Sequence, residues 1–289
     1  MTYYDENCVL LVVADGHGGA PYVRSGFGAR IACTVACDVL KDLVFNENSI
    51  KKIKERFDNY VNLHLKFKPL SISEEEKLGD LPNYYAYGTT LLAVKITKED
   101  TVMLQIGDGK IHAVNRNGNF FQDLPDDDNC FGTYTSSLVT ENALSKIRFK
   151  QYKEPAACVI LYTDGYKPNG DYPWKILENL DLSLTATDLE KEVQSGDKYK
   201  DDQTFLLYFD DTAISSSFHE GIAKEKEIYI KKRNILRVKE EIKSLESFLV
   251  AAIAKYKKLP IEQKETFKKK SILPRYEEYL KLKHKLESF

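Results

Sequence analysis

Four aspartates lie where apolar, strand-like stretches of the sequence end or begin, and they are the first candidates for chemistry. Apolar runs end close before Asp15, Asp108 and Asp164, and another begins shortly after Asp201. Carboxylates at the ends of neighbouring strands meet at one edge of a sheet, where they repel one another. A divalent cation such as Mg²⁺ or Mn²⁺ relieves that repulsion, because it prefers oxygen ligands. A single Asp-Gly pair is typical of a turn, but four such sites in one chain favour a metal centre.

The most distinctive of these sites is the run Asp15-Gly16-His17-Gly18-Gly19. Glycines let the backbone come close to a metal ion or a phosphate group, because they carry no side chain. A lone histidine is a weak signal, but His17 directly follows a candidate metal ligand, where it can serve as a proton donor. The run therefore predicts a metal ligand and a general acid next to each other.

The elements that position these residues are predicted to be strands mixed with long helices. Apolar or alternating stretches predict strands at residues 8–14, 89–95, 101–106, 111–115, 158–163 and 204–209. Apolar positions at helical spacing predict helices at residues 24–45 and 50–65. Periodicity establishes this mixture and leaves the order of the strands open.

Five short motifs carry a family resemblance. They are Asp15–Gly19, Gly88-Thr89-Thr90-Leu91, Ile106-Gly107-Asp108-Gly109, Leu161-Tyr162-Thr163-Asp164-Gly165 and Asp201-Asp202-Gln203-Thr204. In order and approximate spacing they resemble the protein phosphatase 2C (metal-dependent PPM) family over residues 8–210, with residues 135–149 most similar to a bacterial branch. The resemblance implies an α/β (α+β) fold: a four-layer αββα sandwich of two antiparallel sheets flanked by helices, with a C-terminal helical appendage.

The resemblance also implies the ligands of a metal centre. Asp15 would bridge two Mg²⁺ or Mn²⁺ ions, and the Gly16 carbonyl would bind one of them. Asp164 and Asp201 would hold the other ion. Asp108 would join Asp164 at a third, weaker ion. Ions arranged in this way activate a water molecule and clamp the phosphoryl oxygens for in-line attack.

The implied activity is that of a metal-dependent protein serine/threonine phosphatase acting on a phosphorylated protein. His17 would protonate the leaving alkoxide, and no cysteine or serine nucleophile is needed. Family members carry an arginine and acidic residues on a strand well upstream of the glycine-rich motif. Here only 14 residues precede Asp15 and none is arginine. We therefore expect an N-terminally short domain with an unpaired sheet edge and weakened phosphate binding, for which Arg24 and Arg30 are disfavoured as substitutes for the missing arginine. A catalytically impaired pseudophosphatase or binding module is the alternative.

The C-terminal part of the chain has a different pattern of apolar residues. Apolar residues recur every seven positions from Ile228 to Tyr256, with a second series from Val238 to Leu259, which predicts the seam of a long helix. Pro260 should end that helix, and Pro274 suits the start of another. We therefore divide the chain into a catalytic domain at 1–215 and a helical hairpin or coiled-coil extension at 216–289.

Charge separates the two parts as well. Residues 219–289 carry a net charge of +8 and residues 1–218 a net charge of −10. The extension is predicted to bind a protein partner. Nucleic acid is disfavoured, because the lysines alternate with glutamates as on a solvated helix face.

Other residue groups have plainer explanations. Five cysteines at scattered spacing argue against disulfides and favour the cytoplasm, with Cys33 and Cys37 as small buried side chains rather than a metal pair. Residues 126–128 lack the spacing of a calcium loop and predict a solvated loop. Trp174 belongs either to a flap beside the site or to the core. No apolar run reaches the ~18 residues that a membrane span requires.

Overall fold

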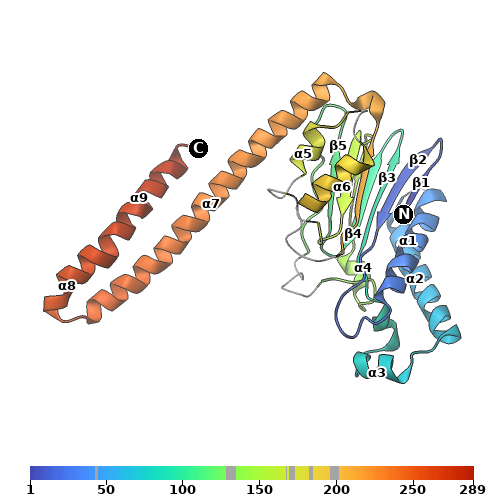
Figure 1. The fold of residues 1–289 in the computed structure, drawn as a ribbon, viewed down its shortest axis with the longest axis horizontal. Helices are drawn as coiled ribbons and strands as arrows, with labels where there is room; N and C mark the ends of the chain where they lie inside the picture. The colour runs from blue at the N-terminus through green and yellow to red at the C-terminus, as the bar shows by residue number, and fades with distance from the viewer. Residues whose placement is uncertain (43–44, 128–134, 167, 169–172, 182–184, 196–201) are drawn as a thin grey trace. The chain divides into compact units, whose positions relative to one another are not determined.

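The computed structural model describes residues 1–289 except 43–44, 128–134, 167, 169–172, 182–184 and 196–201 (Figure 1). The chain divides into two compact units, Met1–Ile222 and Ala223–Phe289, and each is described by itself. The first unit contains both β-sheets and their flanking helices, and the second unit is helical.

The first sheet contains five antiparallel strands in the order β1-β2-β3-β4-β6. They are β1 (Thr2–Tyr4), β2 (Cys8–Val13), β3 (Leu91–Thr97), β4 (Thr101–Ile106) and β6 (Arg148–Tyr152). The strands predicted at 8–14, 89–95 and 101–106 are confirmed as β2, β3 and β4. The short polar strand β1 was not predicted, and it corrects the expectation of an unpaired edge at β2. It pairs Thr2 with Leu11, and the Met1 ammonium group donates a hydrogen bond of 2.7 Å to the Val12 carbonyl.

The second sheet contains three antiparallel strands in the order β5-β7-β8. They are β5 (Lys110–Val114), β7 (Cys158–Tyr162) and β8 (Phe205–Phe209), which confirms the strands predicted at 111–115, 158–163 and 204–209. The side chains of the central strand β7 are buried along its whole length, which explains why its sequence is apolar without alternation.

The two sheets pack face to face around a shared apolar core. That core joins Leu11, Val13 and Leu92 of the first sheet to Ile111 and Leu161 of the second. The alternate residues of β2, Leu10 and Val12, face the opposite way into a second core beneath the helices. Because β2 is covered on both faces, its sequence is a continuous apolar run.

Helices cover the first sheet on its outer face (Figure 1). They are α1 (Ser25–Asp42), α2 (Glu47–Phe67), α3 (Ile72–Leu78) and α4 (Ala143–Lys146), with a short 3-10 helix η1 (Asn83–Tyr87). Val35 and Val39 of α1 and Ile53 and Phe57 of α2 point into the core at helical spacing. The helices predicted at 24–45 and 50–65 are thus confirmed. Asn46 caps α2, because its side chain accepts a hydrogen bond from the Ser49 backbone N–H.

Two further helices lie on the side of the second sheet, α5 (Trp174–Glu178) and α6 (Ala186–Ser195) (Figure 1). Trp174 is only 8% exposed and packs edge-on against Phe120, with ring centroids 5.4 Å apart. It is therefore a core residue. The fold is an α/β sandwich of two antiparallel sheets flanked by helices, with a long C-terminal helical region, as predicted.

The long helix α7 (Ser216–Lys258) begins within the first unit. Phe218 and Ile222 are fully buried there. Gly221 lies directly against the turn at Asn117 and Gly118, so closely that a Cβ atom on Gly221 would overlap the Asn117 carbonyl. The first two turns of α7 are therefore part of the core of the first unit.

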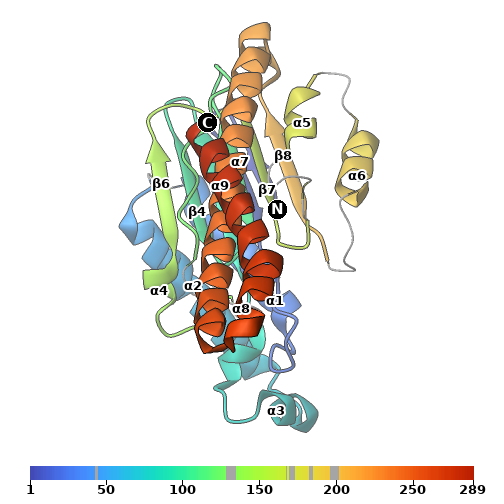
Figure 2. The ribbon, with the colours of Figure 1, turned by 90° about the vertical axis from the view of Figure 1, so that its left-hand side faces the viewer.

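The second unit is a helical hairpin. After α7 come α8 (Ile261–Phe267), a π-helical turn (Lys268–Ile272) and α9 (Leu273–Glu287), which returns alongside α7 (Figure 2). The Tyr279 hydroxyl donates a hydrogen bond of 3.1 Å to Glu246, and the Arg275 guanidinium lies over the Phe248 ring. Val238, Ile242, Leu249 and Ala252 of the predicted seam are buried, whereas Ile228 is 47% exposed. Among the helices that the structure describes, none is long and apolar enough to cross a membrane.

Candidate active site

The predicted site residues Asp15 and Asp108 lie at the same edge of the first sheet. The strand register places Val13 opposite Leu92, and Leu92 opposite Gln105. The ends of β2 and β4 therefore flank the start of β3. Asp15 and Asp108 each follow their strand by two residues, so the antiparallel order of the sheet brings both aspartates to this edge.

The backbone of the glycine-rich motif is held by the segment that precedes β3. The Asp15 N–H donates to the Thr90 hydroxyl at 3.0 Å, and the Asp15 carbonyl accepts from the Thr89 hydroxyl and the Thr90 N–H, each at 2.9 Å. The His17 N–H donates to the Gly88 carbonyl at 3.1 Å. The motif at residues 88–91 thus positions the motif at residues 15–19, which the sequence alone did not indicate.

The imidazole of His17 is partly buried and lies within the electrostatic influence of Asp108. It packs edge-on against Tyr22, with ring centroids 4.8 Å apart. Its Nε2 atom is buried and has no hydrogen-bond partner among the described residues. Burial lowers the pKa of His17, and the negative charge of Asp108 partly opposes that effect. A buried ring nitrogen without a partner is costly, so it marks a place where a substrate or solvent atom would be stabilised.

The turn that carries Asp108 is fixed by side chains that sequence analysis did not single out. The Gln105 side-chain amide donates to the carbonyls of Gly107, at 3.2 Å, and Gly109. The Arg148 guanidinium also donates to the Gly107 carbonyl. The Asp108 side chain is held as well, because the Thr135 hydroxyl donates a hydrogen bond of 2.6 Å to its carboxylate. A buried glutamine in an apolar strand was the available signal for this role.

Asp164 comes to the same end of the sandwich from the second sheet. The register of β5, β7 and β8 aligns Lys110, Tyr162 and Phe205, so β7 ends where β5 and β8 begin. A Cβ atom on Gly109 would lie 2.7 Å from the Tyr162 carbonyl, so the Asp108 turn passes directly beside the end of β7. Asp164 follows two residues later and is exposed.

The segment before β8 lies against Asp164. The Thr163 N–H donates to the Thr204 carbonyl at 3.0 Å, and the Thr204 N–H donates to the Thr163 hydroxyl at 3.1 Å. Asp201 lies outside the described residues, and the neighbouring Asp202 lies within them. The topology thus brings Asp15, Asp108 and Asp164 to one end of the sandwich.

The donors of the predicted metal centre are all oxygen atoms. Carboxylates and a backbone carbonyl are the ligands that Mg²⁺ and Mn²⁺ prefer, so the residue types fit these ions. Within the described residues, no three His, Cys, Asp or Glu side chains lie close enough together to hold a metal ion. The predicted set includes Asp201, which lies outside that part of the chain, so the metal centre remains a prediction.

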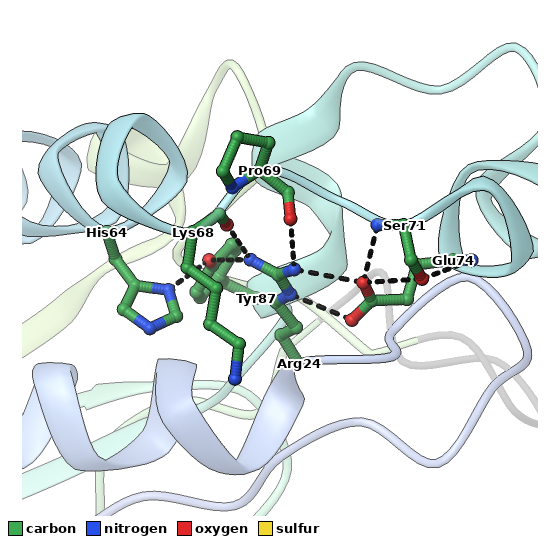
Figure 3. Close-up of polar contacts among 7 residues, drawn as sticks. All are labelled: Arg24, His64, Lys68, Pro69, Ser71, Glu74 and Tyr87. Carbon is green, nitrogen blue, oxygen red and sulfur yellow. Dashed lines mark hydrogen bonds and ion pairs between the residues drawn. The ribbon is translucent and has the colours of Figure 1, made fainter.

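Arg24 is not available to bind phosphate (Figure 3). Its side chain is buried, and all five of its N–H groups are used. Two donate to the Glu74 carboxylate, both at 2.9 Å, two donate to the carbonyls of Lys68 and Pro69, and one donates to the Tyr87 hydroxyl. Arg24 therefore ties the start of α1 to α3 and η1.

The remaining sequence predictions concern residues outside the five motifs. Arg30 is exposed, and its guanidinium lies over the Phe27 ring, 5.8 Å from the centroid. Cys33 and Cys37 are free thiols; Cys37 is buried, as expected, and burial raises its pKa to about 11, whereas Cys33 is half-buried. Asp126 forms a surface ion pair of 2.6 Å with Lys110, whereas Asp128 lies outside the described residues.

Residues 2–212 match the family model described as Protein phosphatase 2C. The chain belongs to the protein phosphatase 2C family. The match includes all five motifs that sequence analysis singled out, and it confirms the family that they predicted. No curated protein matches the chain significantly.

Solved structures with similar folds cover most of the protein phosphatase 2C domain. A Stage II Sporulation E family protein from Thermanaerovibrio acidaminovorans is 17% identical, with a TM-score of 0.46 over 72% of this chain and 98% of the other. The Mycobacterium tuberculosis serine/threonine phosphatase PstP/Ppp is 14% identical, with a TM-score of 0.48 over 72% and 89%. RsbX, solved in complex with magnesium, is 16% identical, with a TM-score of 0.43 over 71% and 83%.

Proposed function

We propose that this protein phosphatase 2C domain is an active, metal-dependent serine/threonine phosphatase that hydrolyses phosphorylated proteins. The observation that supports the proposal is the strand register, which ends β2, β4 and β7 at the same end of the sandwich, next to Asp15, Asp108 and Asp164. Residues 1–215 would form the catalytic domain and 216–289 an extension that binds a partner. Among the described residues, Cys33, Cys37 and Cys158 are free thiols, which supports a cytoplasmic location.

The aspartates would hold the metal ions. Asp15 and the Gly16 carbonyl would hold one ion, Asp164 and Asp201 would hold a second together with Asp15, and Asp108 with Asp164 would hold a weaker third. Mg²⁺ or Mn²⁺ bound there supplies a hydroxide-like water at neutral pH and a clamp for the phosphoryl oxygens. The hydrogen bond from Thr135 and the support of the turn by Gln105 keep Asp108 at this edge.

His17 would act as the general acid. Its backbone is fixed to Gly88, and its buried Nε2 has no partner among the described residues, so the ring can hold a proton for an incoming oxygen. The seryl or threonyl oxygen is a poor leaving group, and a positioned acid is worth ~10²–10⁴-fold in rate. Contact with Tyr22 restricts the orientation of the ring.

One observation favours a second candidate function. Arg24 has no donor left for phosphate and Arg30 lies over Phe27, so neither residue supplies the arginine that the family resemblance calls for. An arginine binds phosphate through two parallel hydrogen bonds, and a site without such an arginine binds its substrate more weakly. The second candidate is therefore an impaired phosphatase that acts as a binding module through its C-terminal helices.

Turnover of p-nitrophenyl phosphate and of a phosphothreonine peptide in Mn²⁺ tests these alternatives. We expect activity that EDTA removes and that Asp164→Asn abolishes, while the matched change at exposed Asp80, Asp80→Asn, leaves it intact. Turnover that survives both EDTA and Asp164→Asn would refute the metal mechanism. Mn²⁺ binding without turnover would instead support the binding module.

A further inference from the structure

The turn of the helical hairpin concentrates positive charge, unlike the rest of the second unit. Residues 255–270, here called the basic turn, contain seven lysines and two glutamates. The preceding residues 223–254 contain eight basic and five acidic residues, and residues 271–289 contain four and three. Opposite charges pair along the helices, as in Arg237–Glu241 and Arg275–Glu278. We predicted a solvated helix face with mixed charges for the whole extension. That prediction fits the helices but does not fit the basic turn.

The backbone of the basic turn exposes three consecutive lysines. Lys268, Lys269 and Lys270 lie on the π-helical turn Lys268–Ile272, and all three are exposed. Lys255, Lys257 and Lys258 at the end of α7 are exposed as well. Basic residues at a helix C-terminus stabilise the helix dipole, which accounts for the end of α7 but not for the lysines after α8. π-helical turns are rare and are found frequently at functional sites.

Apolar surface lies within this charged region. Ile261, the first residue of α8, is 85% exposed. A groove of about 490 Å³ lies beside it, with Leu259 and Phe267 among its lining residues and Lys255 and Lys270 also lining it. The basic turn thus combines apolar side chains with nearby ammonium groups, and one carboxylate, that of Glu262, also lines the groove.

We propose that the basic turn docks on an anionic phospholipid surface. A lysine ammonium group acts as a point charge, so a cluster of lysines is attracted to a surface that carries many negative charges. Binding of a single phosphate group through two parallel hydrogen bonds uses arginine instead. Residues 255–270 contain no arginine. An exposed aliphatic side chain among lysines suits the boundary between headgroups and acyl chains. Single-stranded nucleic acid needs open aromatic faces, but Lys264 lies over the Tyr256 ring and Lys255 over the Phe267 ring. Each lysine near such a surface strengthens binding by about fivefold.

Co-sedimentation of the full-length chain with vesicles tests this inference, independently of catalysis. The protein should bind vesicles of phosphatidylserine and phosphatidylcholine and not vesicles of phosphatidylcholine alone. The triple variant Lys268→Glu, Lys269→Glu, Lys270→Glu should bind at least about 100-fold more weakly. Ile261→Ser should weaken binding by roughly fivefold, because it removes the aliphatic contact. Binding should also fall when the salt concentration rises above about 0.15 M.

A matched variant separates the basic turn from total charge. Lys231, Lys232 and Lys239 are exposed lysines on α7, and their replacement by Glu changes the net charge by the same amount. That variant should bind within about fivefold of the unchanged protein. Equal losses in the two triple variants, equal binding to neutral vesicles, or tighter binding to RNA or duplex DNA than to anionic vesicles would each overturn the proposal. Circular dichroism of the two triple variants should show the helix content of the unchanged protein.

Discussion

The buried pair of Arg24 and Glu74 makes a quantitative prediction about the stability of the first unit. The Arg24 side chain is 4% exposed and the Glu74 side chain 27% exposed, and two hydrogen bonds of 2.9 Å join them. The hydrogen bonds from Arg24, followed by that from the Ser71 N–H, lower the pKa of Glu74 to about 2. We consider the substitutions Arg24→Met and Glu74→Gln, alone and together.

The expected magnitudes follow from the number and burial of these bonds. Hydrogen bonds to charged groups contribute about 1.5–3 kcal/mol each, and the exposed part of Glu74 reduces this by solvent screening. Arg24→Met also leaves the Tyr87 hydroxyl without its donor. We therefore expect Arg24→Met to lower the free energy of unfolding by about 3 kcal/mol and Glu74→Gln by about 1.5 kcal/mol. The coupling energy of the pair should be about 1–2 kcal/mol.

Urea denaturation of the four proteins at neutral pH measures this double-mutant cycle. Lys54 and Asp58 on α2 provide a comparison pair, because they form an ion pair of 2.5 Å one helical turn apart that is more exposed than Arg24–Glu74, with side chains 17% and 43% exposed. Such pairs contribute about 0.3–0.5 kcal/mol. An Arg24–Glu74 coupling no larger than that of Lys54–Asp58 would refute the reasoning.

The same pair predicts a pH dependence. The pKa of Glu74 is lower in the folded state than its ordinary value of 4.5, so its contribution to stability is present in full above pH 4.5. It is lost as the pH falls from 4.5 through about 2. The stability difference between the unchanged protein and Glu74→Gln should therefore shrink over this window. A difference that stays constant would contradict the lowered pKa.

Three other predictions concern the site and its support. His17→Asn should slow hydrolysis of a phosphothreonine peptide by ~10²–10⁴-fold, but should slow p-nitrophenyl phosphate much less, because p-nitrophenolate leaves without a proton; equal losses would argue against acid catalysis. Gln105→Leu should lower the free energy of unfolding by about 1–3 kcal/mol, since two carbonyls lose their buried donor, and an unchanged urea midpoint would contradict this. A chain ending at residue 222 should keep its phosphatase activity. A chain ending at residue 215 should have a lower Tm than that chain, because it lacks the buried residues Phe218 and Ile222. Equal Tm values for the two chains would show that α7 does not complete the core.

Most of the architecture could be predicted, because burial on both faces leaves a clear pattern in the sequence. The strands β2 and β7 are covered on two sides, and their apolar runs identified them. The strand β1 escaped prediction because only three residues pair, and its composition is that of an edge. The buried start of α7 also escaped prediction, because it depends on the contact of Gly221 with the turn at Asn117, which periodicity does not report.

The site was predictable in its residue types and less so in its supports. Asp15, Asp108 and Asp164 stand in motifs, and the strand register explains why all three follow strands that end at one end of the sandwich. The structural role of Arg24 was not predicted, because its hydrogen bonds go to two backbone carbonyls and a distant glutamate that no local pattern connects. Gln105 and Arg148 support the Asp108 turn through backbone carbonyls, and the only sequence signal for these contacts is a glutamine within an apolar strand.

The central claim is that the aspartates at this end of the sandwich form one divalent metal centre that drives phosphate ester hydrolysis. The most direct test counts Mn²⁺ ions per chain by equilibrium titration and measures turnover in the same samples. We predict at least two ions on the unchanged protein, with parallel loss of an ion and of turnover in Asp15→Asn, Asp164→Asn and Asp201→Asn, and no loss in Asp80→Asn. Unchanged Mn²⁺ binding in those three variants, or turnover that persists after the ion is lost, would contradict the claim.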